Sequence, residues 1–178
     1  MTVLNKKIIK NIAATTALAA ITLPLWAANQ GTLGATSTGD LTISMTTENQ
    51  ISITNLQDIA LADNGSGDFT GASPACVYRN GTGSYTITAS GSGPANAFTL
   101  TDGSSNTLPY TVTYDDGTGA QTMAAATALT GRINADTSSK TCANGDNGNI
   151  AVSVASTDVA AVPAGTYTGT LTLTVSPE

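Results

Sequence analysis

Histidine is absent from this 178-residue chain, charged residues make up only 10% of it, and aromatic residues only 4%. Histidine is the most frequent general base in catalysis and a common metal ligand. No serine or cysteine lies in a nucleophile motif such as Gly-x-Ser-x-Gly. We therefore expect neither an enzyme nor a cofactor or metal site.

Basic residues are few, and half of them lie near the N-terminus. Lys6, Lys7 and Lys10 precede an apolar run at 12–26, a pattern typical of a cleavable signal peptide, which we assign to residues 1–27. The run is short for a membrane span and no stop-transfer charges follow it. Without these residues, three basic side chains remain against twelve acidic ones, a net charge of −9. Such a charge argues against nucleic acid as a partner.

Cysteine occurs only twice, as Cys76 and Cys142. An exported protein reaches an oxidising compartment, so one disulfide between them is expected. A metal site would need further ligands, and the chain has no histidine to supply them. Closing so long a loop stabilises a fold by about 4 kcal/mol in the chain-entropy model.

Alternation of apolar and polar residues predicts a series of short strands. Turn residues separate them, including 71–74, interpreted as a loop, and Asp115-Asp116-Gly117, interpreted as a hairpin turn rather than a catalytic pair. The stretch 121–129 is interpreted as a loop or weak strand. The expected strands lie at 51–56, 85–90, 98–101, 108–114, 150–154 and 165–175.

This pattern, with no convincing long helix, predicts an all-β fold: an immunoglobulin-like antiparallel β-sandwich spanning residues 49–178. A β-barrel is the alternative. Two matches to the glycosylation motif, Asn64-Gly-Ser66 and Asn80-Gly-Thr82, are interpreted as ordinary turn formers.

The two ends of the chain are complementary in pattern. Residues 28–48 contain a polar leader and then Leu41, Ile43 and Met45 at a spacing of two, as on one face of a strand. Little sequence follows the last expected strand. These features predict an incomplete sandwich that lacks its last strand and carries an N-terminal donor-strand extension.

In that hypothesis the three apolar leader residues are the donor side chains. The side chains that line the acceptor groove would be Leu171, Leu173 and Val175. The alternative is that residues 40–46 are simply the first strand of a complete sandwich.

Three runs carry a resemblance to a known family. They are GDLTISMTTENQISITNL at 39–56, GSYTITASGSG at 83–93 with LPYTVTY at 108–114, and AGTYTGTLTLTV at 164–175. Together they resemble chaperone-usher pilins, in particular the spore coat U and archaic Csu-type branch.

The resemblance implies a structural pilus subunit, exported through the periplasm to the cell surface, that polymerises into a fimbrium for adhesion or biofilm formation. Its implied partners are neighbouring copies or other pilin subunits, a periplasmic chaperone and an outer-membrane usher. The competing hypothesis is a secreted monomeric β-sandwich that recognises carbohydrate or another surface.

Overall fold

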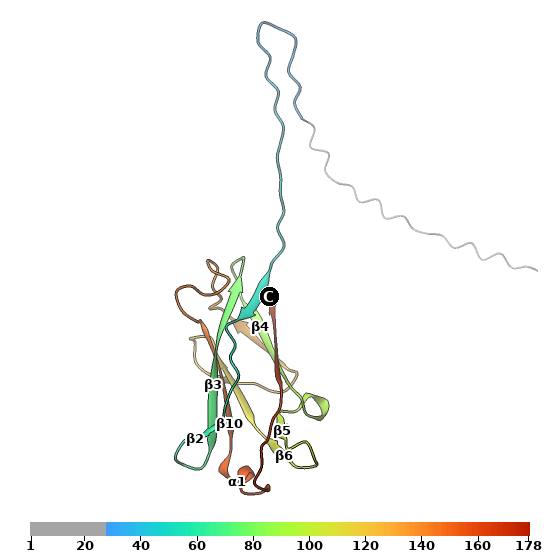
Figure 1. Ribbon diagram of the computed structural model, residues 1–178. Helices are drawn as coiled ribbons and strands as arrows, with labels where there is room; N and C mark the ends of the chain where they lie inside the picture. The colour runs from blue at the N-terminus through green and yellow to red at the C-terminus, as the bar shows by residue number, and fades with distance from the viewer. Residues whose placement is uncertain (1–27) are drawn as a thin grey trace, which may run out of the picture. The chain divides into compact units, whose positions relative to one another are not determined.

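A computed structural model describes residues 28–178, so the expected signal peptide at 1–27 lies outside the described residues. The chain separates into two units, one ending at Thr46 and one spanning Thr47–Glu178 (Figure 1). We call residues 28–46 the leader and Thr47–Glu178 the β-domain.

The leader is extended and its side chains are exposed. Asn29 and Asp40 form an antiparallel bridge, with backbone N–H···O distances of 2.8 and 2.9 Å. The following residues, 41–46, belong to no strand. The side chains of Leu41, Ile43 and Met45 are 70%, 88% and 85% exposed.

Two antiparallel sheets make up most of the β-domain, which confirms the all-β sandwich predicted from the sequence (Figure 1). The larger sheet has the order β1 (Ile51–Thr54), β3 (Phe69–Arg79), β10 (Gly148–Val154), β7 (Thr111–Asp115) and β8 (Gln121–Thr122), with β2 (Ala62–Asp63) also paired to β3. The smaller sheet has the order β11 (Leu171–Pro177), β4 (Tyr85–Gly91) and β9 (Ala128–Arg132).

Short elements complete the β-domain. β5 (Thr99–Thr101) and β6 (Thr107–Pro109) form a two-stranded ribbon. One 3-10 turn spans Pro94–Asn96, and one short helix, α1, spans Ser156–Val159.

The core lies where alternate side chains of the strands turn inward, as the period of two requires. Inward residues of β4 and β7 include Tyr85 and Tyr114, whose hydroxyl groups lie 2.7 Å apart in the buried interior. Burial raises the pKa of both hydroxyls, so both stay protonated. The core also contains Ala75, Val77, Ile87, Ala89, Val112, Ile150, Val152 and Val154.

A disulfide joins Cys76 in β3 to Cys142 in the loop before β10, as the sequence predicted. The two Cα atoms lie 5.7 Å apart, and both residues are buried. The bond therefore ties the loop that precedes β10 to the longest strand of the β-domain.

The loop predicted at 71–74 is wrong, because these residues lie within β3. β1 pairs with β3 only from Cys76 onward, so Pro74, which lacks an N–H, falls where β3 has no partner strand on that side. Position 71 accommodates only a glycine because the segment that contains Ile59 crosses close to it: a Cβ at Gly71 would lie 2.6 Å from Cγ2 of Ile59. Small residues here serve a close approach rather than a turn.

Asp116 locks the hairpin between β7 and β8. It is 1% exposed, and its carboxylate accepts hydrogen bonds from Thr118 and from the backbone N–H of Ile133 and pairs with Arg132 at 3.3 Å. Burial raises the pKa of Asp116, but these hydrogen bonds and the Arg132 guanidinium outweigh burial and hold the pKa below its usual range. The Asp-Asp-Gly sequence is thus a structural turn.

We expect Asp116 to make stability depend on pH in the acid range. Because its pKa is lowered on folding, its stabilising effect is complete above the unfolded-state pKa of about 4 and is lost as pH falls through the lower folded-state pKa. The Asp116→Asn variant should lose about 2 kcal/mol of unfolding free energy at pH 7. The difference from wild type should shrink below about pH 4.

Urea unfolding at a series of pH values measures this difference. Asp115→Asn is the matched control, because an amide oxygen can still accept the hydrogen bonds from Gly117 and Gly119 that Asp115 accepts. An Asp116→Asn deficit of equal size at pH 2.5 and pH 7 would contradict the assignment.

Candidate functional site: an open apolar groove

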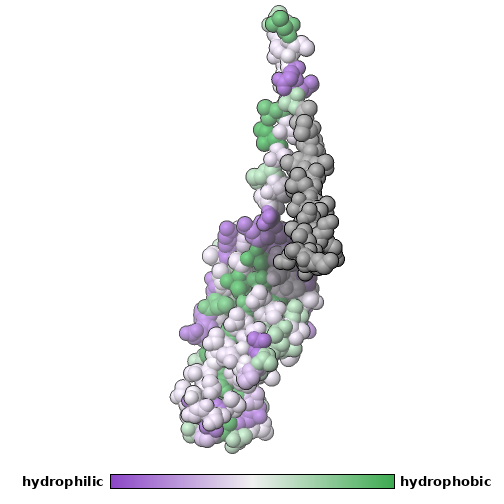
Figure 2. All heavy atoms as spheres, turned by 90° about the vertical axis from the view of Figure 1, so that its right-hand side faces the viewer, coloured by the Kyte–Doolittle hydropathy of each residue, from purple (hydrophilic) through white to green (hydrophobic). Residues whose placement is uncertain are grey.

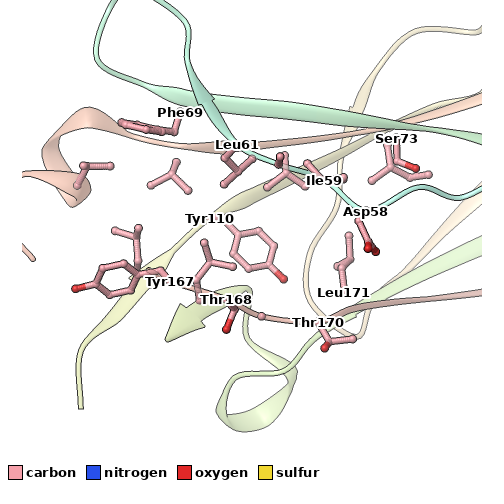
Figure 3. A pocket seen from close by; sticks show the side chains of 18 of the residues that line it. Asp58, Ile59, Leu61, Phe69, Ser73, Tyr110, Tyr167, Thr168, Thr170 and Leu171 are labelled. Carbon is pink, nitrogen blue, oxygen red and sulfur yellow. The ribbon is translucent and has the colours of Figure 1, made fainter. Parts of the chain in front are cut away.

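An apolar groove of about 990 Å³ lies in the β-domain. We call it the groove (Figure 3). One wall is the segment 56–61, and the other is formed by residues 167–173, which lead into and include the first half of β11. The groove is also lined by residues of β3, β6, β10 and α1 and by the residues 162–165 that follow α1. The apolar lining residues include Leu56, Ile59, Leu61, Phe69, Leu100, Leu108, Tyr110, Ile150, Val152, Val154, Val159, Val162, Leu171 and Leu173.

The first wall exists because β1 stops at Thr54. Asn55 adopts a left-handed backbone conformation with φ of 63°, which short polar side chains tolerate. Its side-chain N–H donates to the carbonyl of Thr141 at 3.3 Å and to Oδ1 of Asp146 at 2.7 Å. The chain then leaves the sheet as the segment 56–61, which belongs to no strand.

The second wall is an edge strand. Within residues 28–178, β11 pairs with β4 alone, so its other edge presents unpaired backbone N–H and C=O groups. Leu171 and Leu173 are half-buried, whereas Thr172 and Thr174 between them are exposed. At the far end β1 contacts β11 without pairing to it. The groove thus has a backbone edge to pair with and an apolar interior to fill.

Tyr110 places a polar atom in this apolar surface. The residue is 7% exposed, and its ring stacks on Phe98 with 5.5 Å between centroids. Figure 3 shows the hydroxyl projecting into the groove between the two walls. Burial raises the pKa of this hydroxyl, so it remains a neutral hydrogen-bonding group. Asp58 adds a carboxylate from the first wall.

Figure 2 shows green apolar areas among white side chains of intermediate hydropathy on one face of the β-domain, with purple hydrophilic residues at several places. Within residues 28–178, no group of three or more His, Cys, Asp or Glu side chains is placed to hold a metal ion. None of the helices in that range is long and apolar enough to span a membrane.

The residues predicted for the acceptor groove lie as follows. Leu171 and Leu173 line the groove, whereas Val175 packs against the core and is not among the lining residues. The predicted donor residues, Leu41, Ile43 and Met45, belong to the leader and are exposed.

Sequence reasoning did not assign the first wall or Tyr110 to this site. The apolar spacing of Leu56, Ile59 and Leu61 was the available signal. This spacing indicated that the strand continues through these residues, whereas the structure has 56–61 outside any strand. Val159 and Val162 carried no comparable pattern, because they belong to a single helical turn and the loop after it.

The fold and groove together define a class: a β-sandwich with an apolar groove between a segment that belongs to no strand, 56–61, and the free edge of β11. Among solved structures, the chain is similar to one described as "Chaperone-tip adhesin complex is vital for synergistic activation of CFA/I fimbriae biogenesis". The match has a TM-score of 0.51 and 20% sequence identity, and it covers 72% of this chain and 41% of that chain. At this identity the likeness is one of fold.

Comparison with family models gave no match. Comparison with curated proteins gave none either. The chain spans less than half of the solved chain that it resembles. A function for this protein is therefore inferred from the geometry of the groove and the leader.

Proposed function

We propose that the protein is a structural subunit of a pilus, in which the groove of each copy is filled by the leader of the next copy through donor-strand exchange. The observation that carries the proposal is the groove itself, with the free edge of β11 along one side. An unfilled apolar groove beside an open strand edge favours association.

The leader has the chemistry of an occupant. A strand added to the edge of β11 gains backbone hydrogen bonds along its length and inserts every second side chain into the groove. Leu41, Ile43 and Met45 have that spacing and are exposed. Burying three such side chains contributes about 6 kcal/mol or more to association.

The lengths also agree. The groove wall at 167–173 has seven residues. The stretch from Leu41 to Met45 has five and, when extended, spans about 17 Å at the usual rise per strand residue. An insertion of this length fits along that wall.

Such a contact joins two different surfaces of each copy, the leader and the groove. A head-to-tail contact of this kind repeats without closing and builds a filament. The leader's free segment thus links consecutive subunits. The similarity in fold to a chain of a fimbrial chaperone-tip adhesin complex supports this role.

Before assembly, the groove needs a temporary cover. We propose a periplasmic chaperone that lends a strand to the same edge of β11, and an outer-membrane usher at which exchange and export to the cell surface take place. Adhesion or biofilm formation is the proposed use of the fibre. The chain as a fibre component needs no catalytic residue.

The mature chain, residues 28–178, should form linear polymers in vitro, whereas the same chain without residues 28–48 should not. Size-exclusion chromatography and negative-stain electron microscopy at matched concentrations measure this difference. The second candidate, a monomeric surface-binding domain, predicts a monomer for the complete mature chain. A strictly monomeric mature chain at all concentrations would therefore favour that candidate.

A further inference from the structure

Asn80 follows directly on β3 and contacts the residues through which the leader joins the β-domain. Its backbone N–H donates to the carbonyl of Gln50 at 3.1 Å. The backbone N–H of Gln50 donates to Oδ1 of Asn80 at 2.7 Å. The side-chain N–H of Asn80 donates to the carbonyl of Glu48 at 2.8 Å. Three hydrogen bonds thus converge on one exposed asparagine.

These contacts extend a sheet beyond its last regular pair. The β1–β3 ladder ends at Ile51 and Arg79. A carboxamide offers one acceptor and a donor group, as a peptide unit does, so the Asn80 side chain continues the ladder where β3 has ended. The approach is close, since a Cβ on Gly81 would lie 3.2 Å from Oδ1 of Asn49.

The same short motif elsewhere in the chain behaves differently. Asn64 is also followed by glycine and a hydroxyl residue, but its Oδ1 accepts only from the backbone and side chain of Ser66, at 2.9 and 2.7 Å. The contacts of Asn80 instead reach across 30 and 32 positions. The motif alone therefore does not account for the Asn80 contacts.

We propose that Asn80 is a positioning residue that ties Glu48 and Gln50 to the end of β3, so that the joint between the leader and the ordered sheet is confined to Thr46 and Thr47. The inference rests on the proposed function in one respect: in a fibre, this joint connects consecutive subunits. Each residue released at the joint adds two rotatable backbone angles and softens the link.

The first test is amide hydrogen exchange of the mature chain. Asn80→Ala should lower the protection of the Gln50 amide about tenfold, the size expected for loss of one side-chain acceptor. Asn80→Asp keeps an acceptor for that amide and should retain protection there, while losing the bond to the Glu48 carbonyl. Asn64→Ala is the matched control and should leave Gln50 unchanged. Unchanged Gln50 protection in Asn80→Ala would overturn the proposal.

The second test is the stiffness of the fibre. The persistence length of Asn80→Ala fibres, measured from electron micrographs, should be about half that of wild-type and Asn64→Ala fibres. The melting temperature of the β-domain should stay within about 3 °C of wild type, since only exposed hydrogen bonds change. Equal persistence lengths in all variants would overturn the positioning role.

A failure of the proposed function is distinguishable from a failure of this inference. If the wild-type chain forms no fibre, the pilus assignment is contradicted. The role of Asn80 is then decided in the monomer by ¹⁵N relaxation at Thr47 and Glu48. Greater mobility at Glu48 in Asn80→Ala supports the positioning role, and mobility equal to wild type overturns it.

Discussion

An Ile43→Asp substitution is expected to abolish fibre formation by the mature chain. In the proposed assembly Ile43 is the central inward side chain of the exchanged segment, and the groove it enters is lined by leucine, isoleucine and valine. Losing the buried isoleucine and placing a carboxylate there costs about 4 kcal/mol, or about a thousandfold in affinity between subunits.

Thr42→Asp is the matched control for that experiment. It adds the same charge one position earlier, where the side chain of an inserted strand points away from the groove. Fibres of this variant should form at close to the wild-type yield, as counted by electron microscopy. Equal effects of the two substitutions would contradict the assignment, because they would indicate a response to charge rather than to the inward face.

The same variant should also act in mixtures. Ile43→Asp leaves the groove intact, so a copy of it can still accept a wild-type leader but cannot donate its own. Adding it to wild-type chain should therefore shorten fibres in proportion to its share. If fibre lengths in the mixtures were unchanged, accepting a leader and donating a leader would not be functions of two separate surfaces.

Removing the disulfide should give the largest loss of stability within one subunit. Cys76 and Cys142 are separated by 66 positions, and the chain-entropy model assigns about 4 kcal/mol to closing a loop of that length. The double variant Cys76→Ala, Cys142→Ala should lose about that amount of unfolding free energy. The loop before β10, which carries Cys142, should exchange its amides fastest.

Denaturant unfolding in the Ile43→Asp background measures this loss on a monomer, so that polymerisation does not contribute. Cys→Ser at the same positions is the companion variant. It should be less stable than the alanine pair, because both sites are buried and a hydroxyl there needs a partner. A loss below about 1 kcal/mol in the alanine pair would contradict a clamping role for the bond.

Strands with a clean period of two were predictable from the sequence. β4 begins at Tyr85 and β10 includes 150–154, as that pattern indicated, whereas the strand predicted at 165–175 is β11, which begins only at Leu171 and runs to Pro177. The disulfide was predictable as well, since a chain that is expected to be exported and has two cysteines has one possible internal pairing. Local pattern sufficed for β4 and for 150–154 of β10, but not for β3, in which burial also alternates along the strand.

The interruption of the first strand was not predictable in the same way. Apolar spacing continues from Ile53 through Ile59 and Leu61, yet the ladder ends where Asn55 turns left-handed and bonds to Asp146, 91 positions away. That partner is brought close only by the folded loop before β10. The unpaired wall of the groove therefore depends on a contact that local periodicity does not encode.

β3 and Asn80 show the opposite error, in which turn-forming residues serve sheet contacts. Gly71 makes room for a crossing chain, and Pro74 lies on the unpaired side of its strand. Asn80 extends a ladder with its side chain. Glycine, proline and asparagine are common in turns because of their own backbone preferences and local hydrogen bonds. In this protein, contacts with residues distant in the sequence place them in or beside a strand instead.

The central claim is that the leader of one copy fills the groove of another, and photo-crosslinking between isotopically distinct copies tests it most directly. The mature chain has two methionines, Met45 in the leader and Met123, which is buried in the β-domain. Chains carrying photo-methionine would be assembled with ¹⁵N-labelled chains that lack it.

The account predicts that Met45 links to groove residues of labelled copies, whereas Met123 links only within its own copy and serves as the internal control. Crosslinks from Met45 that join it solely to the groove of its own chain would contradict the account, because each copy would then complete itself.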